Sequence, residues 1–174
     1  MSIITYNGLS PTIHPTAFVA EGVQLIGDVR LAKDASVWYN SVLRGDINVV
    51  EVGERTNIQD CSVLHVTSEF PVRIGSDVTV GSTTSWRHRA IVHGCTVGDC
   101  CLIGMGSVIL DNAKIGSNSL VAAGAVVLEN FVVPEGMLAA GIPAKIIRPL
   151  TEEEKEQSRE SALHYVEYAR RYRS

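Results

Sequence analysis

Aliphatic residues recur at every sixth position over most of the chain. Glycine or another small or polar residue often follows them, as at Gly98, Gly104 and Gly116. An amphipathic helix repeats every 3.6 residues and a two-sided strand every two, so a period of six fits neither. The in-phase residues form two long runs, Ile13, Val19, Leu25, Leu31, Val37, Leu43, Val49 and Val97, Ile103, Ile109, Ile115, Val121, Val127, Val133, with Val52, Ile58, Leu64, Ile74, Val80 and Val92 between them.

A period of six is typical of a coil of very short parallel strands with a turn in every repeat. Each aliphatic residue then points inward, and successive coils hydrogen-bond at a spacing of about 4.8 Å. One repeat cannot bury its own apolar side chain, so the stacking of coils stabilises the fold. The alternative, a β-sandwich of short strands, would not keep one phase from Val97 to Val133. We therefore predict an all-β solenoid, a left-handed parallel β-helix of hexapeptide repeats with a C-terminal α-helix.

The six-residue pattern stops near Pro134, and a helical pattern begins after Leu150. Thr151 and Glu154 have the spacing of a capping box, and arginines near the chain end favour the negative end of a helix. We expect a helix over 151–172 that lies along the β-helix or meets a neighbouring subunit. The predicted organisation is a β-helix domain at 1–150 and a helical segment at 151–174. The expected apolar side of the helix consists of Leu163, Val166 and Ala169, with Tyr165, Tyr168 and Tyr172 beside them.

Composition narrows the function classes. Aromatic residues make up 6% of the chain, so the core is expected to be aliphatic, and a net charge of −4 gives no reason to expect nucleic-acid binding. No apolar stretch approaches the roughly 20 residues that span a bilayer, and no signal peptide pattern is present, so we expect a cytoplasmic protein without a membrane partner. The cysteines are then expected to be reduced, buried and not metal ligands, since no C-x-x-C pair occurs among Cys61, Cys95, Cys100 and Cys101.

Three of the five histidines, His65, His88 and His93, lie in the middle of the repeat. A single histidine is more often structural than a ligand, but the register of these residues is informative. His65 follows the inward Leu64, and His93 follows the inward Val92. Both therefore occupy the same place in their repeats and point outward. The remaining two, His14 and His164, lie outside this group and are expected to be solvent-facing or structural.

The distance along the coil between His65 and His93 depends on Ser82–Arg87. The two histidines are 28 residues apart, and four of these form a loop around Phe70. If the six residues Ser82–Arg87 also loop out, 18 residues remain, which is three strands or one full coil. The two imidazoles then stack on one face and can share a metal. In the alternative, Ser82–Arg87 forms another strand with Trp86 in phase, and His93 is rotated to a different face.

His88 has a different expected orientation. It precedes His93 by five residues and falls near the previous corner of the coil. It would face away from the other two histidines and is well placed to reach the metal of a partner subunit.

Several stretches resemble the γ-carbonic-anhydrase-like branch of the hexapeptide-repeat superfamily, and the resemblance spans nearly the whole chain. The stretches are Val42-Leu43-Arg44-Gly45-Asp46, Thr56-Asn57-Ile58-Gln59-Asp60, Leu64-His65-Val66-Thr67, His93-Gly94-Cys95-Thr96, Gly104-Met105-Gly106 and Gly141-Ile142-Pro143-Ala144-Lys145. The last stretch is shared with many hexapeptide acyltransferases, so it does not distinguish the carbonic-anhydrase-like branch from them.

The resemblance implies a homotrimer with metal sites between subunits. His65 and His93 of one subunit and His88 of the next would bind Zn²⁺, with Fe²⁺ or Co²⁺ as alternatives. The small-molecule substrate would be CO₂, hydrated reversibly to bicarbonate by a metal-bound hydroxide. Roles implied for further residues are a salt bridge across the interface for Arg44 and Asp46, lining of the site for Asn57 and Gln59, and support from the tail for Tyr165.

Two departures from the family pattern bear on activity. In relatives the glycine after Val80 is followed directly by the histidine, whereas Ser82–Arg87 intervenes here. Ile47 stands where the best-studied enzymes carry a glutamate that transfers protons, and the nearby Glu69 follows His65 in a loop. Metal binding is therefore better supported than fast turnover. The alternatives are a hexapeptide-repeat acyltransferase, in which one histidine acts as base, and a metal-binding scaffold without significant turnover.

Overall fold

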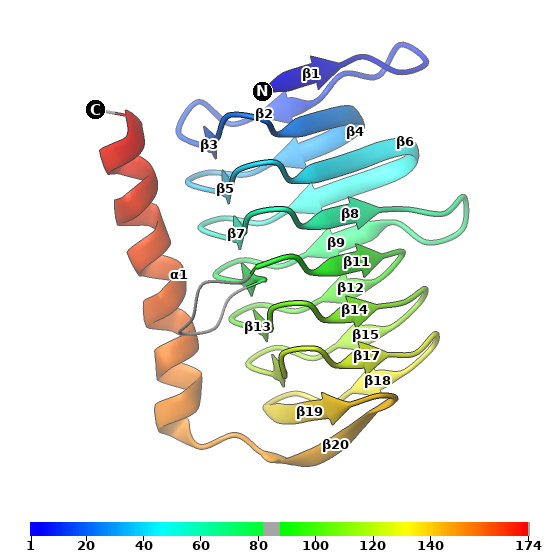
Figure 1. The fold of residues 1–174 in the computed structure, drawn as a ribbon, viewed down its shortest axis with the longest axis vertical. Coiled ribbons are helices and arrows are strands. Elements are labelled where there is room, and N and C mark those ends of the chain that lie inside the picture. The colour runs from blue at the N-terminus through cyan, green and yellow to red at the C-terminus, as the bar shows by residue number, and fades with distance from the viewer. Residues whose placement is uncertain (82–87, 174) are drawn as a thin grey trace.

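The computed structural model describes residues 1–81 and 88–173. The chain winds as a left-handed parallel β-solenoid of about 6 turns, and one C-terminal helix runs along its side (Figure 1). Strands one coil apart pair in parallel, so each side of the coil is a sheet of stacked short strands. This arrangement confirms the predicted fold class.

The coil has three sides. The first side holds the leading halves of β4 (Gln24–Leu31) and β6 (Val42–Val52), then β8 (Val63–His65), β11 (Ile91–His93), β14 (Val108–Ile109) and β17 (Val126–Val127), with β1 (Ser2–Ile4) paired to β4. The second side holds β2 (Thr12–Ile13), the trailing halves of β4 and β6, β9 (Val72–Ile74), β12 (Thr96–Val97), β15 (Lys114–Ile115) and β18 (Val132–Val133). The third side holds β3 (Phe18–Val19), β5 (Ser36–Val37), β7 (Asn57–Ile58), β10 (Thr79–Val80), β13 (Leu102–Ile103), β16 (Leu120–Val121), β19 (Met137–Gly141) and β20 (Ala144–Pro149).

The core is the column of inward aliphatic residues that the six-residue period predicts. On the first side, Leu43, Leu64 and Val92 stack directly on one another in the register of the paired strands. All three are fully buried, as are Ile103 and Ile109 in later coils. Since every coil places its aliphatic residue above that of the coil before, the burial that one repeat cannot achieve is achieved by the stack.

Two details of the predicted repeat are wrong. Val49 is partly exposed, and its neighbour Val50 is buried instead. The register between β4 and β6 shifts after Gly45, because β6 carries extra residues at the corner that β4 does not. The repeat also continues past Pro134, since β19 pairs in parallel with β16 and buries Ala139 before β20 turns back antiparallel.

The C-terminal helix α1 (Glu152–Arg173) begins with the predicted capping box. The Thr151 backbone N–H donates to the Glu154 carboxylate at 2.9 Å, and the Glu154 N–H donates to the Thr151 hydroxyl at 3.2 Å. The helix packs on β3, β5, β7 and β10 of its own chain. Its buried face contains Ala162, Val166 and Ala169, whereas Leu163, predicted to be on that face, is half exposed.

The cysteines only partly match the expectation of burial. Cys95 and Cys101 are buried, and burial raises the pKa of each thiol to about 12, so neither offers a thiolate at neutral pH. Cys61 is exposed and Cys100 is half-buried, because both lie at corners of the coil with positive φ. In the described part of the chain, no helix is long and apolar enough to cross a membrane.

The inward position of Ile103 should be essential for stability. We expect Ile103→Ala to lower the free energy of unfolding by about 2–5 kcal/mol, because it removes buried methylene groups and leaves a cavity between coils. Ile142→Ala is the matched control, since Ile142 is 77% exposed and its truncation should change stability by less than about 0.5 kcal/mol. Denaturant titration at one fixed protein concentration measures both. Equal effects of the two variants would contradict the assigned core.

Candidate metal centre

His65 and His93 lie side by side at the ends of two adjacent strands. In the pairing of β8 with β11, Leu64 is opposite Val92 and His65 is opposite His93. The nitrogen His65 Nδ1 lies 2.9 Å from His93 Nε2, and the ring centroids are 4.9 Å apart. The prediction that the two histidines stack one coil apart is confirmed. The segment Ser82–Arg87, on which that count depended, lies outside the described residues.

A carboxylate holds the other nitrogen of each ring. Asp46 Oδ1 lies 3.3 Å from His65 Nε2, and Asp111 Oδ1 lies 2.5 Å from His93 Nδ1. Burial opposes ionisation of Asp46, but the hydrogen bond from Arg44 and other favourable contacts outweigh it and lower the pKa of this carboxyl. An ionised carboxylate only accepts hydrogen bonds, so His65 Nε2 and His93 Nδ1 carry the ring protons.

This arrangement leaves two lone pairs facing each other. In a neutral imidazole one nitrogen donates and the other accepts, so when both rings are neutral His65 Nδ1 and His93 Nε2 are both acceptors, 2.9 Å apart. Burial, followed by the nearby charge of Arg44, lowers the pKa of His65 and so favours its neutral form. Two facing acceptors repel unless a cation lies between them. A tetrahedral metal with N–metal distances of about 2.0–2.1 Å separates its ligand nitrogens by about 3.3 Å, which a slight opening of this pair provides.

Asp111 is a residue of the candidate site that the sequence analysis missed. It lies 18 residues after His93, which is one coil of three six-residue strands, and this step along the repeat is the signal that could have found it. The backbone makes room for the contact at Gly94, where an added Cβ would lie 2.6 Å from Asp111 Oδ1 and where φ is +50°. A carboxylate that fixes the tautomer of a ligand histidine is typical of protein metal sites.

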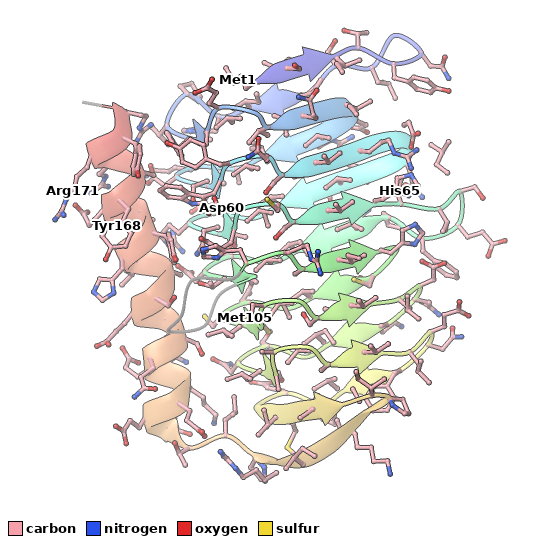
Figure 2. The ribbon with its side chains drawn as sticks, in the orientation of Figure 1. Met1, Asp60, His65, Met105, Tyr168 and Arg171 are labelled. Carbon is pink, nitrogen blue, oxygen red and sulfur yellow. The ribbon has the colours of Figure 1, made fainter. Side chains whose placement is uncertain are left out.

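His88 lies at the other end of the same strands. It precedes β11, whereas His93 ends it. His88 Nδ1 donates to the backbone oxygen of Gly81 at 3.0 Å, so the neutral ring offers Nε2 as its lone pair. That nitrogen lies 3.6 Å from Asp60 Oδ2. In Figure 2, Asp60, the neighbour of His88, lies on the side nearer α1, whereas His65 lies at the far corner.

Asn57 and Gln59 are near His88 rather than near the histidine pair. Both are buried, and Gln59 Nε2 donates to Asn57 Oδ1 at 2.6 Å. The Cβ of Gln59 borders Gly81, whose carbonyl holds His88. Tyr165, on α1, packs against Trp38 with ring centroids 5.7 Å apart.

The candidate site residues other than Tyr165 thus form two groups in one chain. We call Arg44, Asp46, His65, His93 and Asp111 the paired-histidine cluster, and Asn57, Gln59, Asp60 and His88 the lone-histidine cluster. Within residues 1–81 and 88–173, no group of three or more His, Cys, Asp or Glu side chains is arranged to hold a metal ion in a single chain. A third ligand for the histidine pair therefore has to come from outside these residues or from another chain.

Comparison with known proteins identifies the class. Residues 94–129 match the family model described as bacterial transferase hexapeptide (six repeats). A carbonic anhydrase from Geobacillus kaustophilus is 44% identical, over 99% of this chain and 91% of that protein. The mitochondrial γ-carbonic anhydrase 2 of Arabidopsis thaliana is 41% identical, over 92% of this chain and 58% of that protein. The structure of a hexapeptide transferase family protein from Anaplasma phagocytophilum has a TM-score of 0.90 and 42% identity, covering 98% of this chain and 97% of that chain.

The fold and the histidine pair define a hexapeptide-repeat β-helix with paired histidines on its outer face. At this identity over nearly its full length, the chain belongs to the γ-class carbonic anhydrase-like branch of the hexapeptide-repeat family.

The contact between Asp111 and His93 should control metal affinity. We expect Asp111→Ala to weaken Zn²⁺ or Co²⁺ binding roughly 10–100-fold, because the His93 ring loses the acceptor that fixes its tautomer. Glu129→Ala is the matched control, since Glu129 is an exposed carboxylate at the same corner one coil further on. Competition with a chromophoric chelator measures both affinities. Unchanged affinity in Asp111→Ala would remove Asp111 from the site.

Proposed function

We propose that this protein is a metal-dependent γ-carbonic anhydrase-like enzyme that hydrates CO₂ reversibly to bicarbonate at sites between the subunits of a homotrimer. The observation that carries this proposal is the pair of acceptor nitrogens on His65 and His93, held 2.9 Å apart by carboxylates on their far sides. Such a pair is suited to a divalent cation. The carbonic anhydrase relatives are consistent with the same reading.

A cyclic trimer would join the two clusters. In a head-to-tail interface, one end of a surface contacts the other end of the same surface on the next subunit. The paired-histidine cluster and the lone-histidine cluster lie at opposite ends of β8 and β11, so this contact brings three histidines together. The outward face between them is an aliphatic ladder in strand register, and Val63 and Ile91 on it are 37% and 42% exposed. The ladder consists of Val42, Val63, Ile91, Val108 and Val126.

The nitrogen atoms that the chain offers as ligands suit a divalent metal. His65 Nδ1, His93 Nε2 and, from the next subunit, His88 Nε2 are neutral imidazole nitrogens, which suit Zn²⁺, Fe²⁺ or Co²⁺. These three histidines would hold the metal, which would supply an acidified water molecule, the chemistry that CO₂ hydration requires. Asp46 and Asp111 orient two ligands, and the Gly81 carbonyl orients the third.

Other residues of the chain would orient the substrate side of the site. Arg44 pairs with Asp46 within one chain and is half exposed, so it remains available to a neighbouring subunit. Gln59 and Asn57 present carboxamides beside His88, and we assign to Gln59 the hydrogen bond to the reacting water. Tyr165 is proposed to support this side of the site from α1. Ile47 has no group that can carry a proton, whereas Glu69 is an exposed carboxylate. Proton release from the site is therefore proposed to depend on buffer or on Glu69.

Subunit complementation tests the shared site. We expect His93→Ala and His88→Ala each to lose bound metal when prepared alone. In a random mixture of the two variants, about one quarter of the sites should regain metal, because each mixed cyclic trimer contains one interface with both clusters intact. Elemental mass spectrometry after co-refolding measures the recovery. The control mixes His93→Ala with His65→Ala, which should recover nothing, and recovery there or its absence in the first mixture would contradict the arrangement.

Stopped-flow measurement of CO₂ hydration tests the activity. The metal-loaded wild type should hydrate CO₂ faster than His93→Ala, in which the pair is broken. Rates no faster than those of the variant, with one metal bound per subunit, would favour the scaffold without turnover. The family model and a solved relative carry transferase names, which keeps acyl transfer as a second candidate. Acetyl-coenzyme A binding in the absence of CO₂ hydration would favour that candidate.

A further inference from the structure

A chain of hydrogen bonds, buried except at its last contact, runs from Gln59 to helix α1. Gln59 Nε2 donates to Asn57 Oδ1 at 2.6 Å, and Asn57 Nδ2 donates to Thr79 Oγ1 at 2.9 Å. Thr79 Oγ1 then lies 3.4 Å from Ser161 Oγ on the helix. Asn57, Gln59 and Thr79 are buried between the third side of the coil and α1. The chain therefore connects a residue of the lone-histidine cluster to a part of the protein far from it in sequence.

The chain fixes which atom Gln59 presents. The backbone oxygen of Val78 lies 3.4 Å from the Asn57 carboxamide, and a carbonyl only accepts, so the atom facing it is Nδ2. Asn57 Oδ1 must then face Gln59, and the Gln59 atom that meets it must be Nε2. In the described part of the chain, no buried side-chain nitrogen or oxygen lacks a partner. Gln59 is 2% exposed, and its Oε1, which accepts no hydrogen bond from those residues, is the acceptor that remains available.

We propose that Thr79 and Ser161 are positioning residues that lock the Gln59 carboxamide with its oxygen toward the site. The proposal rests on the proposed function, because it concerns the side of Gln59 that meets the partner's paired-histidine cluster. With Oε1 outward, Gln59 accepts a hydrogen bond from a donor such as water and disfavours an anionic oxygen in the same place. Without the Thr79 hydroxyl, only the longer contact with the Val78 carbonyl holds the Asn57 carboxamide, and the Gln59 carboxamide turns more readily to present Nε2.

The position of α1 makes this lock testable with a matched pair of variants. Ser161 and Ser158 lie three residues apart on the same helix. Ser161 Oγ contacts Thr79 on the coil, whereas Ser158 Oγ donates to the Glu154 carbonyl within the helix. Ser161→Ala thus removes the end of the chain, and Ser158→Ala removes a serine hydroxyl from the same helix without touching it. Thr79→Val removes the central hydroxyl at nearly constant volume, and Thr79→Ser restores it.

Hydrogen exchange of the side-chain amides of Asn57 and Gln59, followed by NMR, reads the lock without any metal. We expect these protons to exchange at least about tenfold faster in Thr79→Val than in wild type, with a smaller increase in Ser161→Ala. Ser158→Ala and Thr79→Ser should match wild type. Exchange in Thr79→Val equal to wild type would overturn the proposal. Should Thr79→Val fail to fold, identical exchange in Ser161→Ala and Ser158→Ala would overturn it.

Catalysis supplies the second readout. At equal metal content, kcat/KM for CO₂ hydration should fall roughly two- to tenfold in Thr79→Val, because one neutral hydrogen bond orients the acceptor, and Thr79→Ser should recover it. Unchanged kcat/KM with faster amide exchange would overturn the functional part of the proposal. If wild type hydrates no CO₂, the proposed function fails, while the amide exchange still decides whether Thr79 and Ser161 hold Gln59.

Discussion

The vertical register of the coils is the constraint on which the rest of the structure depends. Backbone hydrogen bonds between strands one coil apart hold every residue directly above its counterpart. The same register stacks the aliphatic core and places His65 beside His93, so stability and the candidate site come from one interaction. A change of one six-residue repeat between the two histidines would keep the aliphatic phase of the core but place the histidines on different sides of the coil. The site is therefore more sensitive to register than the fold is.

Much of this could be predicted from the sequence because the repeat is a strong, regular signal. The six-residue period gave the solenoid, and counting along it placed the histidine pair. The prediction at Val49 failed because the additional residues in β6 leave no mark in the hydrophobic pattern, where Val49 and Val50 are equally aliphatic. The prediction that Leu163 lies on the buried face of α1 was wrong for a related reason. Helical spacing does not say whether leucine or alanine faces a closely packed sheet.

Polar contacts across coils were harder to predict than the core. Asp111 lies one coil from its partner, but a lone aspartate at a corner is also the usual residue for a turn, so its type alone does not mark it. The hydrogen bonds from Asn57 to Thr79 and between Thr79 and Ser161 join segments that no local pattern connects. Such contacts depend on where α1 packs, and helical periodicity predicts that a helix forms without predicting which strands it covers.

The corner loops have a consequence for how this protein can change in length over evolution. The turn after His65 around Phe70 and the long corner of β6 add residues outside the stacked strands, and the coils above and below them remain paired. Insertions at such corners cost little, because loop-closure entropy rises only slowly with length. An insertion within the strands keeps His65 stacked on His93 only when its length is a multiple of a whole turn. Gene-level length variation should thus accumulate at corners, where new segments can reshape the surroundings of the histidines while their spacing stays fixed.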